Sequence, residues 1–104
     1  MIVSTYPVTH PSIPSATWTK VSVIPAGSTM PRKLLVLMNE DGTNTFRFEF
    51  VQAGGSVPTL ATQGLPLYSH GEVTYDHTAC PTGDVYVYQA SGGALTSLGV
   101  MEGI

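Results

Sequence analysis

The sequence predicts one small all-β domain, an antiparallel β-sandwich or barrel of about six strands, preceded by an extended proline-rich arm. Three observations predict this fold class. Glycine and proline recur so often among the 104 residues that no long helix fits between them. The windows that remain are as long as strands and rich in Val, Thr, Tyr and Phe. Several of these windows alternate apolar with polar residues, which is the periodicity of a half-buried strand.

We assign residues 1–17 to the N-terminal arm and residues 18–104 to the β-domain. Three prolines, at positions 7, 11 and 14, favour an extended backbone in the arm. Because such a segment cannot form a core of its own, we expect it to stay mobile or to lie along a partner. Deletion of residues 1–14 is then expected to leave a folded domain. The candidate partner-binding residues of the arm are apolar: Ile2, Val3, Tyr6, Val8 and Ile13.

The first half of the domain contains three predicted strands, at residues 18–24, 34–39 and 45–51. The second of these is apolar on both faces, so both faces should be covered. The third has the clearest alternation in the chain, with phenylalanines at 46, 48 and 50 and charged residues between them. Asp41-Gly42 is a hairpin turn signal, so the third strand is expected to return beside the second.

The second half begins with a long connection, residues 52–71, which is interrupted by glycine and proline. A loop of this length inside a small domain is often functional. Three further strands are predicted at 72–78, 84–90 and 94–102. The last two flank Ser91-Gly92-Gly93, which is predicted to form a tight hairpin loop.

Composition narrows the range of partners. Charged residues make up 11% of the chain, against about 25% in an average soluble domain, and the net charge is −3. We expect no nucleic-acid partner, because phosphate binding needs a basic patch and only Arg32 and Lys33 are adjacent. We expect no membrane span, because no apolar run approaches about 20 residues. Residues 1–17 lack the features of a signal peptide, and a single cysteine excludes an internal disulfide framework.

The histidines and the cysteine offer only a weak metal-binding pattern. A metal site would have to gather His70, His77, Cys80 and Asp76, whose donor types suit zinc. Zinc sites usually contain short paired spacings such as C-x-x-C, and no such pair is present. These side chains are therefore expected to lie in polar loops, and we predict no metal and no cofactor.

No catalytic motif is found either. Cys80 precedes Pro81 in a turn, and free cysteines are more often small buried hydrophobes than nucleophiles. No G-x-S-x-G marks a serine nucleophile. Gly54-Gly55 lacks the Lys and Ser/Thr that complete a phosphate-binding loop. We therefore predict no catalytic residues and a function other than that of an enzyme.

The tyrosines allow two interpretations. Tyr86 and Tyr88, with Tyr68 and Tyr75, could form a platform on which sugars stack. The more ordinary interpretation is that they pack against the long loop or a neighbouring subunit, because aromatics at every second position commonly cover a sheet face. A carbohydrate-binding module built on Tyr86, Tyr88 and the loop 64–78 is therefore kept as an alternative.

Four sequence segments, in order, support a family resemblance. They are Ile24-Pro25-Ala26-Gly27-Ser28 leading through Arg32-Lys33 into the strand ending at Asn39; residues 41–50; Gly64-Leu65-Pro66-Leu67 followed by Gly71-Glu72; and residues 83–88 with the 91–93 turn and a last strand ending Met101-Glu102-Gly103. From about Ile24 to Gly103 the chain thus resembles small all-β head decoration, or cement, proteins and related capsid-associated virion proteins of tailed bacteriophages.

This resemblance implies a structural, non-enzymatic role on the exterior of a phage head assembled in the host cytoplasm. It implies the major capsid protein as partner and a homo-oligomer, with a trimer favoured. The contacts would come from the arm and from apolar residues of the long loop, which are Leu60, Leu65, Leu67 and Tyr68. A structural protein of the phage neck or tail would share these sequence features and is a second alternative.

Overall fold

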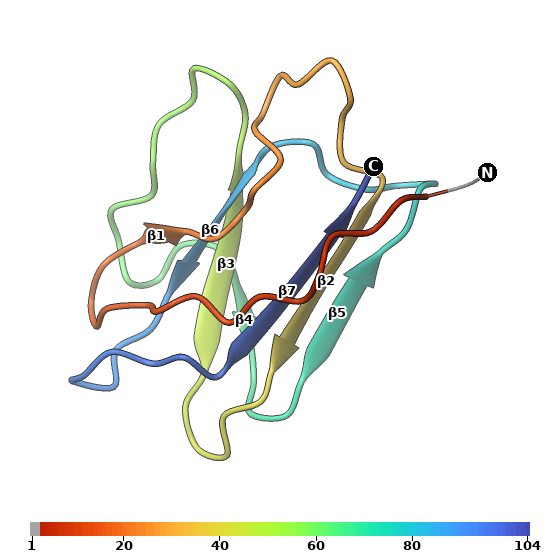
Figure 1. Cartoon of the computed structure of the whole chain (residues 1–104). Helices are drawn as coiled ribbons and strands as arrows, with labels where there is room; N and C mark the ends of the chain where they lie inside the picture. The colour runs from red at the N-terminus through yellow and green to blue at the C-terminus, as the bar shows by residue number, and fades with distance from the viewer. Residues whose placement is uncertain (1–2) are drawn as a thin grey trace.

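Two antiparallel β-sheets pack face to face in the computed structural model, which describes residues 3–104 (Figure 1). In the first sheet the strand order is β1-β6-β3-β4, and in the second it is β5-β2-β7. The bounds are β1 Thr19–Lys20, β2 Leu34–Asn39, β3 Phe46–Val51, β4 Leu65–Leu67, β5 Glu72–Tyr75, β6 Asp84–Tyr88 and β7 Leu98–Gly103. The predicted small all-β sandwich is confirmed, with seven strands in the described residues where about six were expected. These residues include no helix that could cross a bilayer.

The core lies between the sheets and follows the alternation of the strands. In β3 the side chains of Phe46 and Phe48 are buried, while Arg47 between them is half-buried. In β6 the valines face the core and the tyrosines face outward. Each buried aliphatic or aromatic side chain contributes roughly 1.5–3 kcal/mol. The other fully buried apolar side chains are Ile13, Leu35, Leu37 and Leu98.

Strand β2 is buried on its inner face but only partly covered on its outer face, although its apolar sequence predicted cover on both. Leu34 and Met38, which lie on the outer face with Val36, are half-buried. It is the middle strand of its sheet, with β5 and β7 on either side. Leu35 and Leu37 are fully buried, and Val36, which points to the opposite face, is 7% exposed.

The two predicted hairpins are wrong, because both turns join strands of different sheets. The Asp41-Gly42 turn connects β2 to β3, and the 91–93 turn connects β6 to β7. At the first turn, the buried Asn39 side chain donates to the Asn44 and Leu67 carbonyls and accepts from the Asp41 N–H. A turn does form at Asp41-Gly42, as its sequence predicted. The hydrogen bonds of Asn39, however, direct the chain across to the other sheet instead of back along β2.

The Asp41 carboxylate organises the same turn. It accepts hydrogen bonds from the backbone N–H groups of Thr43 and Asn44 and from the Ser97 hydroxyl. The two backbone N–H donors, together with the hydroxyl, hold the pKa of Asp41 well below its usual range. The ionised carboxylate is therefore part of the folded turn.

The first predicted strand is shortened to β1, two residues long, for a visible reason. Beyond Lys20, the backbone N–H groups of Val23 and Ile24 donate to the carboxylate of Glu102 instead of to a neighbouring strand. A side chain thus replaces the sheet ladder at the last two residues of the predicted strand, whereas the Val21 N–H still donates to the Val85 carbonyl of β6.

Strand β4 lies inside the connection that was predicted to have little regular structure. Its central residue is Pro66, which lacks an N–H and is tolerated at the edge of a sheet. Gly64 precedes the strand with a φ of +74°, and a Cβ there would collide with the Phe48 carbonyl. The strand was not predicted because proline and glycine both have low strand propensity. Here Pro66 lies at a sheet edge, and Gly64 lies close to the backbone of Phe48.

The arm lies along its own domain, antiparallel to β7 and beside its free edge (Figure 1). Backbone bridges join Thr5 to Gly103, Thr9 to Val100 and Ile13 to Leu95. The contacts recur every four residues and so avoid the prolines between them. The backbone is extended as predicted, but the surface along which it lies belongs to the same chain.

Ile13 requires a correction. It was expected to contact a partner, but its side chain is 0% exposed and belongs to the core. The buried Gln89 amide donates to the Ile13 carbonyl and so holds this part of the arm in place. Deletion of residues 1–14 removes this core side chain, so we now expect the deletion to destabilise the domain.

We predict that Ile13→Ala lowers the free energy of unfolding by about 2–5 kcal/mol, because it leaves a cavity in the core. Val8→Ala, in the same arm but exposed, should change it by less than about 0.5 kcal/mol. Urea denaturation followed by tryptophan fluorescence measures both values. Equal effects of the two substitutions would show that the arm is not packed as described.

We predict that stability falls as the pH drops below about 5, partly through Asp41. The unfolded chain takes up this proton near the ordinary aspartate pKa of about 3.9, whereas the folded chain takes it up at lower pH. The stabilisation is therefore complete above the unfolded pKa and is lost as the pH falls through the folded pKa. Asp41→Asn should show a shallower acid dependence in urea titrations between pH 6 and pH 2, and an unchanged slope would contradict the assignment.

Candidate functional site

The residues expected to contact a partner lie on two separate edges of the sandwich. Tyr6 and Val8, on the arm at the β7 edge, are exposed, and Val3 is half-buried. Leu60, Leu65 and Tyr68 of the long connection are also exposed. Leu67 is 5% exposed and packs in the core, so like Ile13 it is not available as an anchor. Ile2 lies outside the described residues.

The first exposed apolar region is the arm surface, which we define as Tyr6, Val8 and Val23. Tyr6 and Val23, but not Val8, line a hollow of about 280 Å³ between the arm, the segment after β1 and β7. Val23 is 64% exposed, although it lay within a predicted strand. The fold exposes it because its N–H is bonded to Glu102 and its side chain turns outward.

The second exposed apolar region is the β4–β5 groove, a hollow of about 410 Å³ between the edge strands of the two sheets. Leu65 and Tyr68, which are 56% and 67% exposed, lie at its rim. Strands β5 and β7 are opposite edges of one sheet, so the groove and the arm surface lie on opposite sides of the sandwich. The groove is lined by Phe48, Leu65, Pro66, Leu67, Tyr68, Gly71, Glu72, Val73 and Tyr75.

The long connection is held against the outer face of the first sheet by side chains. The Arg47 guanidinium donates to the carbonyls of Thr62, Gln63 and Gly64. The Trp18 indole N–H donates to the Leu60 carbonyl at 3.1 Å. Leu60 is therefore exposed at a loop with a defined position.

The outward tyrosines pack within the molecule. The rings of Trp18 and Tyr88 are 5.4 Å apart, and Trp18 is itself bonded to the long loop. Tyr75 makes an edge-to-face contact with Phe50 at 5.5 Å. Tyr86 and Tyr88 are half-buried, whereas Tyr68 is exposed at the groove. The four tyrosines do not form one open platform.

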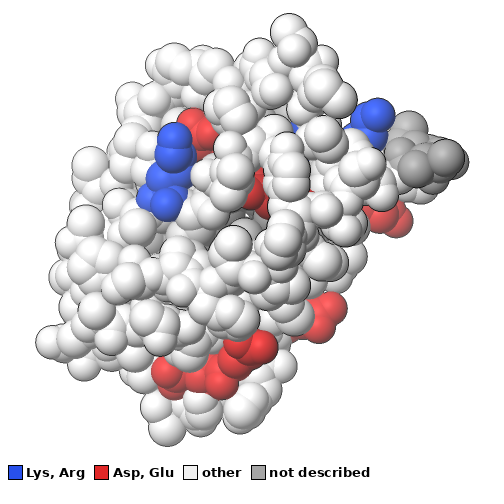
Figure 2. All heavy atoms as spheres, viewed as in Figure 1, with Lys and Arg blue, Asp and Glu red and all other residues white. Residues whose placement is uncertain are grey.

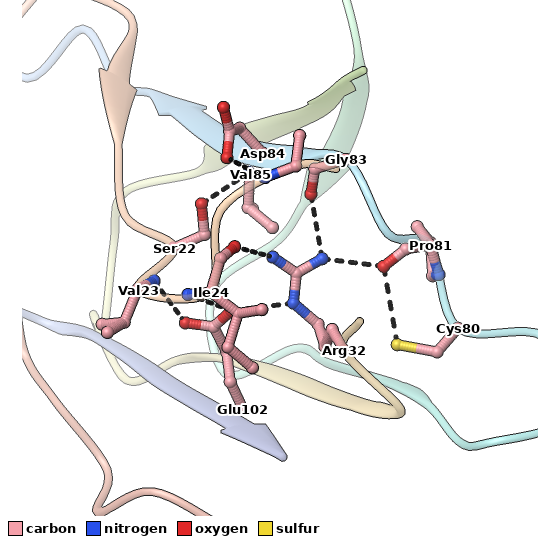
Figure 3. Close-up of polar contacts among 11 residues, drawn as sticks. Ser22, Val23, Ile24, Arg32, Cys80, Pro81, Gly83, Asp84, Val85 and Glu102 are labelled. Carbon is pink, nitrogen blue, oxygen red and sulfur yellow. Dashed lines mark hydrogen bonds and ion pairs between the residues drawn. The ribbon is translucent and has the colours of Figure 1, made fainter. Parts of the chain in front are cut away.

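A buried ion pair, Arg32–Glu102, occupies the corner between the sheets (Figure 3). The Nε–Oε2 distance is 2.7 Å, and the two side chains are 0% and 2% exposed. The guanidinium also donates to the carbonyls of Ile24, Pro81 and Gly83. In the described residues no buried side-chain nitrogen or oxygen lacks a partner. This pair ties two loops, the β1–β2 and β5–β6 connections, to β7, and its role is structural.

The sequence did not identify this pair. Arg32 was noted only for its neighbour Lys33, and Glu102 stood inside a predicted strand. The arginine and the glutamate are 70 residues apart, so no local spacing connects them.

The side chains considered for a metal site do not gather. Within residues 3–104 no group of three His, Cys, Asp or Glu side chains could hold an ion. Asp76 instead bonds to Thr78, whose hydroxyl and N–H lower the pKa of that carboxyl. Burial raises the pKa of the half-buried Cys80 thiol, which disfavours the reactive thiolate.

A hydrogen bond between side chains links the arm to the turn after β2. The His10 imidazole lies 2.7 Å from the Glu40 carboxylate, and both side chains are about half exposed to solvent. An exposed pair of this kind adds little stability. It adds to the backbone bridges that hold the arm.

Comparison of the chain with protein-family models, curated proteins and solved structures gave no match.

We predict that Arg32→Lys lowers the free energy of unfolding by about 3–5 kcal/mol, because it leaves buried polar groups unpaired. A lysine ammonium cannot satisfy the carboxylate and three carbonyls in the fixed directions of a guanidinium. Lys33→Ala is the neighbouring control, since the Lys33 side chain makes no hydrogen bond within the described chain. Thermal and urea unfolding measure both, and similar values for the two variants would contradict a central role for the pair.

Proposed function

We propose that this chain is a structural virion protein, a capsid decoration or cement protein that binds a bacteriophage head and stabilises it by bridging neighbouring subunits. In this proposal the chain acts through contacts and performs no catalysis. Its partner is the major capsid protein, and it binds from the capsid exterior as a homo-oligomer, with a trimer favoured.

The observation that supports the proposal most is the pair of exposed apolar regions on opposite edges of the sandwich. The arm surface and the β4–β5 groove are separated by a packed core. Exposed apolar patches on a small protein commonly mark interaction sites. A rigid body with two such regions can contact two subunits at once, which is what bridging requires.

The surface chemistry is compatible with this role. Figure 2 shows a face that is mostly uncharged, with acidic and basic side chains in small separate groups. Depletion of charge and the presence of tyrosine are typical of protein interfaces. Binding to the folded state alone would also stabilise both the chain and the shell by mass action.

Co-sedimentation with heads that lack the protein tests the proposal. We predict that the wild-type chain sediments with the heads and raises the temperature at which they open. Leu65→Ala/Tyr68→Ala and Tyr6→Ala/Val8→Ala should each weaken binding by about tenfold or more, since buried interface anchors contribute about 1 kcal/mol or more each.

Met30→Ala/Val57→Ala is the matched control, because both residues are exposed and belong to neither region. It should bind as the wild type does. Absence of binding at saturating concentration would contradict the proposal, and equal weakening by all three double variants would contradict the assigned surfaces. Imaging of the particle then places the chain at the head, or at the neck or tail.

A further inference from the structure

The four outer edges of the two sheets are protected to different degrees. The β7 edge is covered by the arm. Strand β1 is only two residues long, and β4 is three residues long with Pro66 at its centre. Strand β5 has four residues and no proline, and its outer edge has no partner strand within residues 3–104. An open strand edge is a template for pairing with another chain.

The register identifies which backbone groups of β5 are free. The Asn39 N–H donates to the Gly71 carbonyl, so this antiparallel pair is a hydrogen-bonded one. Because bonded pairs alternate, Val73 and Tyr75 bond to β2, whereas Glu72 and Thr74 direct their N–H and C=O groups away from the sheet. An incoming strand would pair with Glu72 and Thr74.

The β4–β5 groove adjoins this edge and supplies side-chain contacts. Val73 and Tyr75 contribute to its lining from β5, and Leu65 and Tyr68 contribute from the β4 side. In a strand added to β5, every second side chain would point toward this groove, because side chains alternate between faces. The groove therefore favours apolar residues at alternate positions of the added strand.

Charge distinguishes among the strands that could bind. The exposed face of β5 has Glu72 at one end and Asp76 just beyond the other. Lys33 is the basic residue nearest to Asp76 along the β2–β5 pairing. It forms no ion pair in the described part of the chain, so it does not pair with the Asp76 carboxylate. His70 and His77 are exposed beyond the two ends of the strand.

A second copy of β5 is a poor occupant. In the antiparallel register that is centred on Thr74, Glu72 of one copy lies opposite Asp76 of the other at both ends. Like charges directly opposite each other are destabilising. Nor does this chain contain two basic residues four positions apart, since its only ones are Lys20, Arg32, Lys33 and Arg47.

We propose that β5 and the β4–β5 groove bind an extended segment of a different protein by strand addition. The segment has Lys or Arg at two positions four residues apart, opposite Glu72 and Asp76, and apolar residues at the second and fourth of the five positions. This goes beyond the decoration role, since it specifies the chemistry of the bound segment whatever particle supplies it.

The test uses the full chain and a nine-residue peptide with Lys-Ile-Thr-Val-Lys at its centre. A second peptide has Glu in place of both lysines. NMR titration should show binding of the lysine peptide, binding of the glutamate peptide weaker by about tenfold or more, and slower hydrogen exchange at the Glu72 and Thr74 amides. Glu72→Lys/Asp76→Lys should reverse the preference.

Two matched pairs of variants locate the site. Thr74→Pro removes an outward N–H and should abolish binding, whereas Thr74→Val retains it. Leu65→Ala should weaken binding, whereas Leu60→Ala, equally exposed but outside the groove, should not. If Thr74→Pro misfolds, the comparison of Leu65→Ala with Leu60→Ala and the hydrogen-exchange data still test the position of the site.

Failure of the lysine peptide to bind, absence of protection at both amides, or equal binding of the two peptides would overturn the proposal. None of these measurements involves phage heads, so they are independent of the test of the decoration role.

Discussion

The buried Arg32–Glu102 ion pair holds together the corner where the two sheets and two of their loops meet. Two charges removed from water are costly unless their hydrogen-bonding positions are satisfied. Here the guanidinium binds the carboxylate and three backbone carbonyls, and the carboxylate also accepts the N–H groups of Val23 and Ile24. Because these partners come from the β1–β2 loop, the β5–β6 loop and β7, only one arrangement of the corner satisfies them all. The pair specifies geometry more than it adds stability.

The same strand, β7, connects this corner to both halves of the molecule. Its inner neighbour is β2 and its outer neighbour is the arm, whose Ile13 completes the core. The arm is thus integral to the fold, and the arm surface is held at a fixed position relative to the β4–β5 groove. A protein that acts by contact gains from such rigidity, because less conformational entropy is lost when it binds.

Prediction from sequence succeeded where the signal was local and periodic. The alternation around Phe48 correctly separated the two faces of β3, because side-chain direction along a strand depends only on position. It failed for the apolar residues of irregular segments. Ile13 and Leu67 resembled the exposed Leu60 and Leu65 in sequence, and no periodicity distinguished the buried from the exposed. Strand β4 was missed because Pro66 is compatible with a strand only at an edge.

The all-β class of the chain and the positions of most strands could be predicted from short-range spacing of Gly, Pro and apolar residues. The pairing of the strands, the course of the arm and the contact of Arg32 with Glu102 across 70 positions could not, because they depend on long-range packing. The Asp41-Gly42 turn shows why. Turn chemistry is local, but the sheet that a strand joins is decided by burial of all the apolar faces together. The contact regions depend on the same choice, since the groove exists only where the edges of the two sheets meet.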